Sequence, residues 1–426
     1  MKKIFFFLGI IFFFILTLLA LGLFLIDKNF LDLKQKIYSN YPNIELRLNV
    51  FSKKPILNNL KNDYNVKFLP FTQFEKLKYS KIKIIFEDDL IFKSKQLTDS
   101  ISYKRYNSFF IDEYKQKILI TDYLGNTYFL NQEELFSENK IEILAKNIEN
   151  NLLATRVMDS FIHDNKIFIS YILNQDGCNT INVSFAELNY KKLNFSKFYN
   201  PNICNNTGSP GRMQLYKTLG SSGILLSTSE GIHDNPGDNT QNKDSIFGKI
   251  LYLPFNENKE IIFSSGHRVI QGLNVLDNNI IATEHGPRGG DEVNLIIQNQ
   301  NYGWPIVSLG ERYDFKYQEK KITYKKNHKK NNFQEPIFSF IPSIGVSEII
   351  NLPSSFSIYY DNHYLISSLN GRSIYFTRFN FNLSKVISME KVFINNRIRD
   401  IKYLKNYNSI ILALEEFGEI GILSKN

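Results

Sequence analysis

A strand–turn–strand unit that recurs six times is the feature that most constrains the fold of this 426-residue chain. Each copy holds an apolar strand, a short turn rich in Asn, Asp, Gly or Lys, a second strongly apolar strand and, after a gap, a third strand. Many of the apolar residues are β-branched or aromatic, and they alternate or form short continuous runs, which is typical of strands. The copies begin near Phe109, Phe161, Met213, Leu273, Ile358 and Ile401.

A single unit of this kind exposes a sheet face that it cannot cover alone. The units must therefore stack to bury their Ile, Leu, Phe and Tyr side chains. Six units that close into a ring meet this requirement, and each has the size of one propeller blade. We predict an all-β fold, a six-bladed β-propeller over residues 101–426. A β-sandwich or an irregular all-β protein is the alternative.

The N-terminus predicts a membrane anchor. Two lysines precede an apolar run from Ile4 to Ile26, which is about the length of a helix that crosses a bilayer. The lysines favour a cytoplasmic N-terminus and place the rest of the chain on the extracytoplasmic, periplasmic side. A cleaved signal peptide is the alternative, although its apolar region is usually shorter. We expect a single transmembrane helix over residues 1–26, a tether over 27–55, and in 56–100 either the start of the first blade or a small appended element.

The charge and the cysteines limit the possible partners and compartments. The formal charge of +9 is spread along the chain, and the one dense basic run, Lys325–Lys330, has no interleaved aromatic residues. We therefore expect a solvated loop there and no nucleic-acid partner. Cys178 and Cys204 could form a disulfide only in an exported protein, and two unrelated thiols are the alternative.

The stretch Thr283–Pro305, TEHGPRGGDEVNLIIQNQNYGWP, is the strongest candidate for a functional loop. Its first part is dense in charge and in glycine, and glycine and proline disfavour both helix and strand. Apolar strands flank it at residues 272–282 and 293–297. Charged loops held on rigid strands often carry binding and catalysis.

The stretch RIRD predicts an anionic ligand. Strand alternation places Arg397 and Arg399 on one face, with Asp400 on the other. Two neighbouring guanidinium groups repel each other unless an anion lies between them or each has its own carboxylate. The pair therefore favours a ligand that carries carboxylates or phosphates. Surface arginines with separate acidic partners are the alternative.

Several short motifs together resemble the glucose/sorbosone dehydrogenase family. They are EHGPRGGDE, NLI, NYGWP, GHR followed by QGL, DS followed by GKI, LNGRS and RIRD. The resemblance extends from about Asn150 to the C-terminus and, more weakly, over the first unit. It implies a quinoprotein similar to the soluble aldose sugar dehydrogenases, which use pyrroloquinoline quinone (PQQ) on a six-bladed propeller.

The resemblance also implies a cofactor site. Arg268, Arg397 and Arg399 would hold the carboxylates of PQQ. Ser343 stands at a position that carries a hydroxyl in the family. Asn370 stands where the family has a lysine near the LNGRS motif.

A calcium ion is implied in the same way. It would bridge cofactor and protein through the main-chain oxygens of Gly286 and Pro287. A hard dication suits oxygen ligands and would polarise the quinone for hydride attack. Glu284 and Asp291 are either further ligands or structural partners of Arg288.

Three positions depart from the family pattern. Met158 stands where the family has its general-base histidine, and a thioether cannot accept a proton from a sugar hydroxyl. Val269 replaces an asparagine after GHR, and Asn370 replaces the lysine. Another group would then have to act as the base. The candidates are His163, Asp159 and His233.

Two functions from different classes remain. The first is a membrane-anchored, extracytoplasmic sugar dehydrogenase that removes a hydride from the C1 hydroxyl of an aldose and passes electrons to a membrane acceptor. The second is a catalytically degenerate propeller that binds a sugar or an acidic ligand without redox turnover. A structural envelope protein is a weaker third. The density of motifs favours the enzyme.

Overall fold

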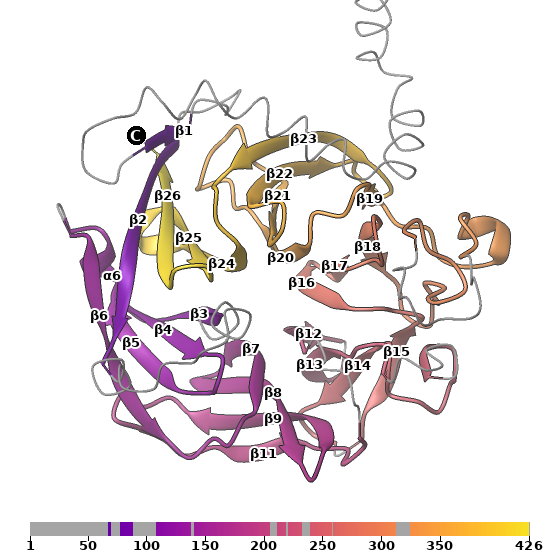
Figure 1. The fold of residues 1–426 in the computed structure, drawn as a ribbon, viewed down its shortest axis with the longest axis horizontal. Helices are drawn as coiled ribbons and strands as arrows, with labels where there is room; N and C mark the ends of the chain where they lie inside the picture. The colour runs from indigo at the N-terminus through magenta and orange to yellow at the C-terminus, as the bar shows by residue number, and fades with distance from the viewer. Residues whose placement is uncertain are drawn as a thin grey trace, which may run out of the picture. The chain divides into compact units, whose positions relative to one another are not determined.

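The predicted all-β architecture is confirmed by the structure, a computed structural model (Figure 1). Helical elements among the described residues are short: α6 (Gln132–Leu135), η2 (Lys329–Asn331) and η3 (Lys405–Tyr407). None of them is long and apolar enough to cross a membrane. The predicted anchor and tether lie outside the described residues. The structure describes residues 67–69, 77–87, 108–137, 140–204, 211–218, 220–231, 239–257, 259–311 and 324–425.

Four sheets of four strands each follow one another along the middle of the chain. The first contains β7 (Arg156–His163), β8 (Lys166–Gln175), β9 (Cys178–Glu187) and β11 (Ser196–Tyr199). The second contains β12 (Met213–Lys217), β13 (Ser222–Ser227), β14 (Lys249–Pro254) and β15 (Ile261–Ser265). The third contains β16 (Ile270–Leu276), β17 (Asn279–Glu284), β18 (Asp291–Ile296) and β19 (Phe338–Phe340). The fourth contains β20 (Val346–Asn351), β21 (His363–Ser368), β22 (Ser373–Phe379) and β23 (Val386–Phe393).

A larger, ten-stranded sheet unites the two ends of this series. Its first antiparallel run is β3 (Phe109–Tyr114), β4 (Lys117–Asp122), β5 (Thr127–Asn131) and β6 (Glu142–Asn150), and its last is β24 (Ile398–Leu404), β25 (Ser409–Leu414) and β26 (Glu419–Lys425). The strand β2 (Leu77–Phe86) joins them, because it pairs antiparallel with β26 and parallel with β6. Two short strands, β1 (Lys67–Leu69) and β10 (Lys192–Leu193), lie at its sides.

The first strand of each antiparallel run lies toward a common centre (Figure 1). These strands contact one another in the closed order β3, β7, β12, β16, β20, β24 and back to β3. Loops that follow or precede them can therefore meet in one place although they are far apart in sequence.

Apolar side chains of neighbouring sheets share the hydrophobic clusters, as the stacking argument requires. One cluster joins Ile281 and Val293, on β17 and β18, to Ile349 and Ile366, on β20 and β21. All four are fully buried. Truncation of such a side chain to alanine typically costs about 2–5 kcal/mol, so each interface between sheets contributes substantially to stability.

The predicted start of the fifth unit is wrong. The expected strand near Ile358 is a turn, in which Ile358 and Tyr359 are exposed. The strand that takes this place is β20, whose Val346 and Ile349 are buried. The apolar letters IYY resemble a strand, but in the folded chain Ile358 and Tyr359 are exposed in a turn and only Tyr360 is buried.

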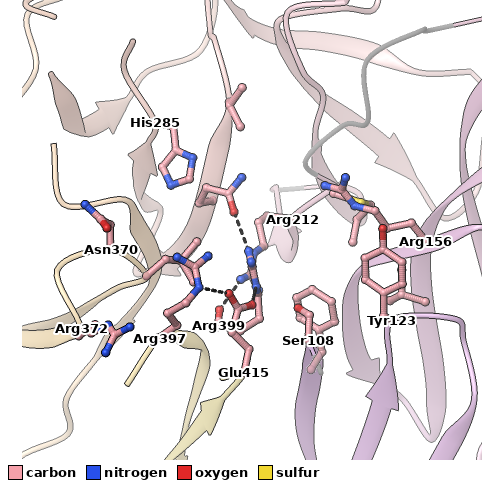
Figure 2. A pocket seen from close by; sticks show the side chains of 16 residues that line it. Ser108, Tyr123, Arg156, Arg212, His285, Asn370, Arg372, Arg397, Arg399 and Glu415 are labelled. Atoms are coloured by element: carbon pink, nitrogen blue, oxygen red, sulfur yellow. Dashed lines mark hydrogen bonds and ion pairs between the residues drawn. The ribbon is translucent and has the colours of Figure 1, made fainter. Parts of the chain in front are cut away.

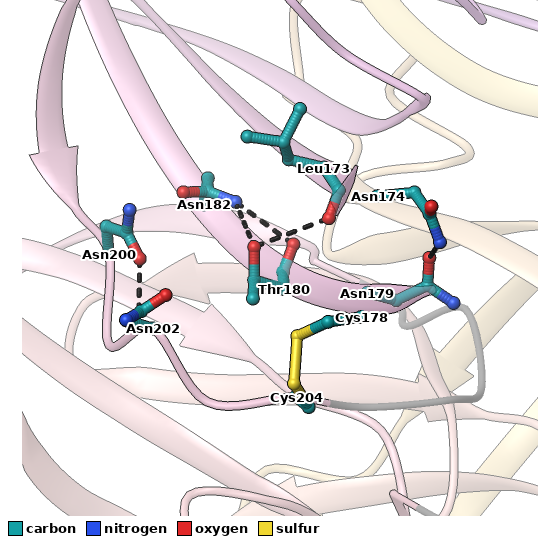
Figure 3. The surroundings of a disulfide bond; sticks show 9 residues. All are labelled: Leu173, Asn174, Cys178, Asn179, Thr180, Asn182, Asn200, Asn202 and Cys204. Carbon is teal, nitrogen blue, oxygen red and sulfur yellow. Dashed lines mark hydrogen bonds between the residues drawn. A yellow bond between two sulfur atoms is a disulfide. The ribbon is translucent and has the colours of Figure 1, made fainter. Parts of the chain in front are cut away.

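Cys178 and Cys204 form a disulfide in the structure (Figure 3). It links the first residue of β9 to the segment that follows β11. The two cysteines are separated by 26 positions, so the bond restricts the unfolded chain. Of the two alternatives for these residues, the structure has the paired one.

Candidate functional site

A cavity of about 700 Å³ lies where the first strands of several sheets meet. Its wall is rich in arginine. In Figure 2, Asn370, Arg372 and Arg397 lie on one side, and Arg156 and Tyr123 lie on the other. Among the residues that the structure describes, Glu415 contributes the one carboxylate of the lining. The five arginines that line the cavity are Arg156, Arg212, Arg372, Arg397 and Arg399.

Bulges in the first strands direct three side chains toward this cavity. The strand register breaks at Met158 in β7, at Gln271 in β16 and at Arg399 in β24. All three residues line the cavity. A bulge inserts an extra residue into a strand and re-aims its side chain, and bulges are common beside functional sites.

Arg397 and Arg399 share one carboxylate. The Nε atom of Arg397 lies 2.7 Å from one oxygen of Glu415, and the Nε atom of Arg399 lies 2.8 Å from the other. Glu415 directly follows β25, which pairs with β24. Burial raises the pKa of Glu415, but Arg399 and Arg397 outweigh it and hold this pKa below its usual value. Together, Arg397, Arg399 and Glu415 carry one net positive charge at the cavity wall.

A buried charge network extends from Arg212, one of the residues that line the cavity, into the protein interior. Arg212 Nη1 is 2.7 Å from a carboxylate oxygen of Glu348 and 3.1 Å from one of Asp159. Asp400 is also near it, at 3.6 Å. Lys402 and Asp112 extend the network, with 3.3 Å between Nζ and the carboxylate. Carboxylates therefore outnumber cations in the network, and burial raises the pKa of Glu348 to about 8 despite the attraction of Arg212.

We expect the stability of the protein to decrease as pH rises. Burial also raises the pKa of Asp112 to about 7 and that of Asp159 to about 6. The folded protein therefore binds more protons than the unfolded chain from about pH 4, where the unfolded carboxyls ionise, to about pH 8. Over this window the free energy of unfolding should fall by about 1.4 kcal/mol per pH unit for each carboxyl that stays protonated in the folded state. The variant E348Q, measured by urea unfolding, should show a flatter dependence. The exposed E187Q variant is the control, and an equal slope in all three proteins would contradict the assignment.

The acidic residues of the candidate loop serve as structural acceptors. One carboxylate oxygen of Asp291 accepts hydrogen bonds from the backbone N–H groups of Ile344, Gly345 and Val346, at 3.0, 2.6 and 3.1 Å. Glu284 accepts from His267 Nδ1 at 3.0 Å. These bonds attach the loop to the neighbouring strands and occupy oxygens that a metal ion would need.

The main-chain oxygens that the resemblance gives to calcium have donors in the structure. Arg268 donates to the carbonyl of Gly286 at 3.1 Å, and Ser343 donates to that of Pro287 at 3.3 Å. Arg268 also lies over the ring of Trp304, at 5.2 Å. Among the residues that the structure describes, no cluster of three or more His, Cys, Asp or Glu side chains could hold a metal ion.

The structure brings together some of the predicted cofactor residues and separates others. Arg397, Arg399 and Asn370 line the same cavity. Arg268 and Ser343 do not line it, because both side chains are directed to the backbone of the 286–290 loop. Arg397 and Arg399 of the RIRD motif therefore lie together at the cavity. Arg268, the third arginine of the predicted cofactor site, does not join them there.

The three departures from the family pattern all lie at the cavity. Met158, Val269 and Asn370 belong to its lining. His285 also lines it, and its Nε2 lies 2.7 Å from the carbonyl oxygen of Val346, which can only accept. Nε2 therefore carries a hydrogen, and burial lowers the pKa of this imidazole.

The two candidate bases within the described part of the chain do not line the cavity. His163 stacks on Phe255, with 5.5 Å between ring centroids, and does not line the cavity. Asp159 is buried and paired with Arg212, and it also accepts from the backbone N–H of Met213 at 2.8 Å. His233 lies outside the described residues.

Sequence reasoning missed several residues of the wall. Arg372 is part of the LNGRS motif, so the motif itself was a signal for it. The sequence around Glu415 and Gln271 gave a weaker indication. Strand pairing brings Glu415 to the cavity, and a bulge brings Gln271 there. Nothing in the local sequence marked Arg156 or Arg212.

Comparisons with known proteins identify relatives of this chain. Two curated relatives are the uncharacterized protein slr1608 of Synechocystis sp., 28% identical over 202 residues, and the aldose sugar dehydrogenase YliI of Escherichia coli, 27% identical over 204 residues. The matches cover 42% and 44% of this chain, and 46% and 53% of those proteins. The chain thus spans about half the length of the curated relatives it matches.

Solved structures of sugar dehydrogenases share the fold. A crystal structure of a glucose dehydrogenase aligns with a TM-score of 0.61 at 18% identity, over 78% of this chain and 99% of that one. The PQQ-bound aldose sugar dehydrogenase of Streptomyces coelicolor aligns with a TM-score of 0.52 at 14% identity, over 73% and 91%. These likenesses establish a propeller-like fold.

The family assignment follows from the sequence match. The model of the glucose/sorbosone dehydrogenase family matches residues 107–421, well over half of the 426-residue chain. This range includes every residue of the arginine-rich cavity. The chain belongs to the glucose/sorbosone dehydrogenase family.

Proposed function

We propose that this protein is a PQQ-dependent dehydrogenase that oxidises the C1 hydroxyl of an aldose. The observation that carries the proposal is the pair Arg397 and Arg399, which shares one carboxylate at the wall of a 700 Å³ cavity. A positive wall in a cavity of this size suits an organic polyanion. Membership in the family and the name of the Escherichia coli relative support the same activity.

The residues of the cavity fit PQQ, a planar quinone with three carboxylates. Arg397 and Arg399 would hold carboxylates, and the amide of Asn370 would donate a hydrogen bond. When bound, PQQ supplies a quinone that accepts a hydride. The protein would orient the sugar between the two walls of the cavity and exclude water there.

The fit to calcium is poor. Arg268 already donates to the Gly286 carbonyl, and the carboxylate of Asp291 is bonded to three backbone N–H groups. A guanidinium beside that carbonyl would repel a dication. We therefore derive no step through Ca²⁺.

We infer further that the chain forms a ring of six blades, carries a membrane anchor and lies outside the cytoplasm. The closed cycle of six first strands supports the six blades. The apolar run Ile4–Ile26 supports a single-pass helix with the propeller on the periplasmic side, and the disulfide between Cys178 and Cys204 suits an oxidising compartment. A membrane electron acceptor would be the natural partner of an anchored dehydrogenase.

The test uses the full-length protein with PQQ, with and without Ca²⁺, and a reducible dye. Aldose-dependent reduction of the dye would support the dehydrogenase. Binding of PQQ without turnover would indicate a degenerate quinoprotein. Absence of PQQ binding would contradict the proposed dehydrogenase and would favour a binding propeller.

We expect M158H to turn over aldoses faster than the unchanged protein. Met158 lines the cavity and its thioether cannot accept a proton, whereas an imidazole can. Well-placed general bases contribute two to four orders of magnitude, so a base that is not optimally placed should raise kcat about tenfold. M158L, which changes shape without adding a base, is the control. Equal rates in M158H and M158L would show that a base at this position does not limit the reaction.

A further inference from the structure

Arg212 contacts residues on four of the central strands, β3, β7, β20 and β24. It precedes β12 and is buried. Its Nη1 reaches Asp159 on β7 and Glu348 on β20, and its guanidinium lies 5.0 Å from the ring of Phe110 on β3. Its Nη2 donates to the carbonyl oxygen of Arg399 on β24 at 2.9 Å.

The contact to Arg399 satisfies a group that the sheet leaves without a partner. Arg399 is the extra residue of the bulge in β24, between the paired residues Ile398 and Asp400. A bulged residue is left out of the ladder of strand hydrogen bonds. A buried carbonyl without a donor is costly, so the bond from Arg212 should favour this backbone position.

The side chain of Arg399 is held on other sides. Its Nε donates to Glu415 and its Nη1 donates to Gln271 on β16 at 3.2 Å. Arg212 instead binds the backbone carbonyl of Arg399, which the bonds from its side chain to Glu415 and Gln271 do not hold. It is therefore placed to couple the position of Arg399 to the carboxylates of β7 and β20.

We propose that Arg212 is a positioning residue for the cofactor wall: it fixes the bulge of β24 and so holds the guanidinium of Arg399 at the cavity. This inference rests on the proposed function, because it gives the wall the task of binding the carboxylates of PQQ. The planar guanidinium serves the carboxylates and the carbonyl at the same time through separate nitrogens. A lysine has one ammonium group and cannot match this fork.

The experiment compares R212K with E348Q in the full-length protein. Both variants change the same buried network, but only R212K removes the bond to the Arg399 carbonyl. R212K should weaken PQQ binding about tenfold or more, measured by calorimetric titration of the cofactor-free protein, since a displaced binding group loses this much. E348Q should bind PQQ with close to the original affinity.

A second measurement does not depend on the cofactor. Isotopically labelled arginine allows NMR to follow hydrogen exchange of the Arg399 Nε–H, which is protected by Glu415. This exchange should accelerate in R212K and stay slow in E348Q. If it stays slow in R212K, or accelerates equally in both variants, the proposal is wrong. If the unchanged protein fails to bind PQQ, the proposed function fails, and the exchange rates still decide whether Arg212 positions Arg399.

Discussion

Replacement of Arg399 with glutamine is expected to weaken PQQ binding about 100-fold, since loss of one partner from a partly buried charged contact costs about 2–5 kcal/mol. Arg399 lines the cavity, and its guanidinium is held by Glu415 and Gln271. The fold should survive, because Glu415 keeps its bond to Arg397 at 2.7 Å. Calorimetric titration of the cofactor-free protein measures the effect.

R378Q is the matched control for this prediction. Arg378 lies on β22 and is exposed, and it is not part of the cavity lining. Its replacement removes the same charge from the surface and should leave PQQ affinity unchanged. If R399Q and R378Q bind PQQ equally well, the wall that contains Arg397 and Arg399 does not bind the cofactor.

Replacement of Glu415 with glutamine should lower the free energy of unfolding by about 2 kcal/mol, less than for a fully buried pair because solvent screens the two arginines. Glu415 is buried, whereas Arg397 and Arg399 are partly exposed. Without the carboxylate, two neighbouring guanidinium groups repel each other. Because the pKa of Glu415 is depressed, its contribution to stability is present above the ordinary carboxyl range and is lost as pH falls below it. Urea unfolding near neutral pH measures the change.

E416Q is the matched control for E415Q. It removes a carboxylate from the same turn but leaves the one that Arg397 and Arg399 share. Glu416 pairs with Arg372 at 2.9 Å, and the arginine is more exposed than either partner of Glu415. Its replacement should cost clearly less. Sodium sulfate should restore more stability to E415Q than sodium chloride at equal ionic strength, because an oxyanion can bind between the two guanidinium groups. If E415Q is as stable as the unchanged protein, the shared carboxylate is not what keeps the pair together.

The strand pattern predicted most of the fold because it depends on local periodicity. The first strands indeed begin at Phe109 and Met213. The prediction for the fifth unit failed at Ile358, because Ile358 and Tyr359 are exposed in a turn while the neighbouring Tyr360 is buried. Burial is a property of the neighbouring chain, so a run of apolar residues cannot by itself distinguish a strand from an exposed turn.

The site was predictable only where a motif carried its residues. RIRD and LNGRS led to Arg397, Arg399 and Asn370, which share the cavity. GHR led to Arg268, whose side chain instead donates to the carbonyls of His285 and Gly286. Motif membership places a residue in a region, but the hydrogen bonds of its side chain decide which way it points.

The amino-acid sequence by itself determined the all-β class, the recurring units and the arginine pair, because strand periodicity and residue chemistry are local properties. Only the tertiary structure decided that one carboxylate, Glu415, would serve both arginines, and that Arg212 would reach the backbone of Arg399. Those contacts depend on the register of paired strands and on bulges, which arise when distant segments of the chain meet.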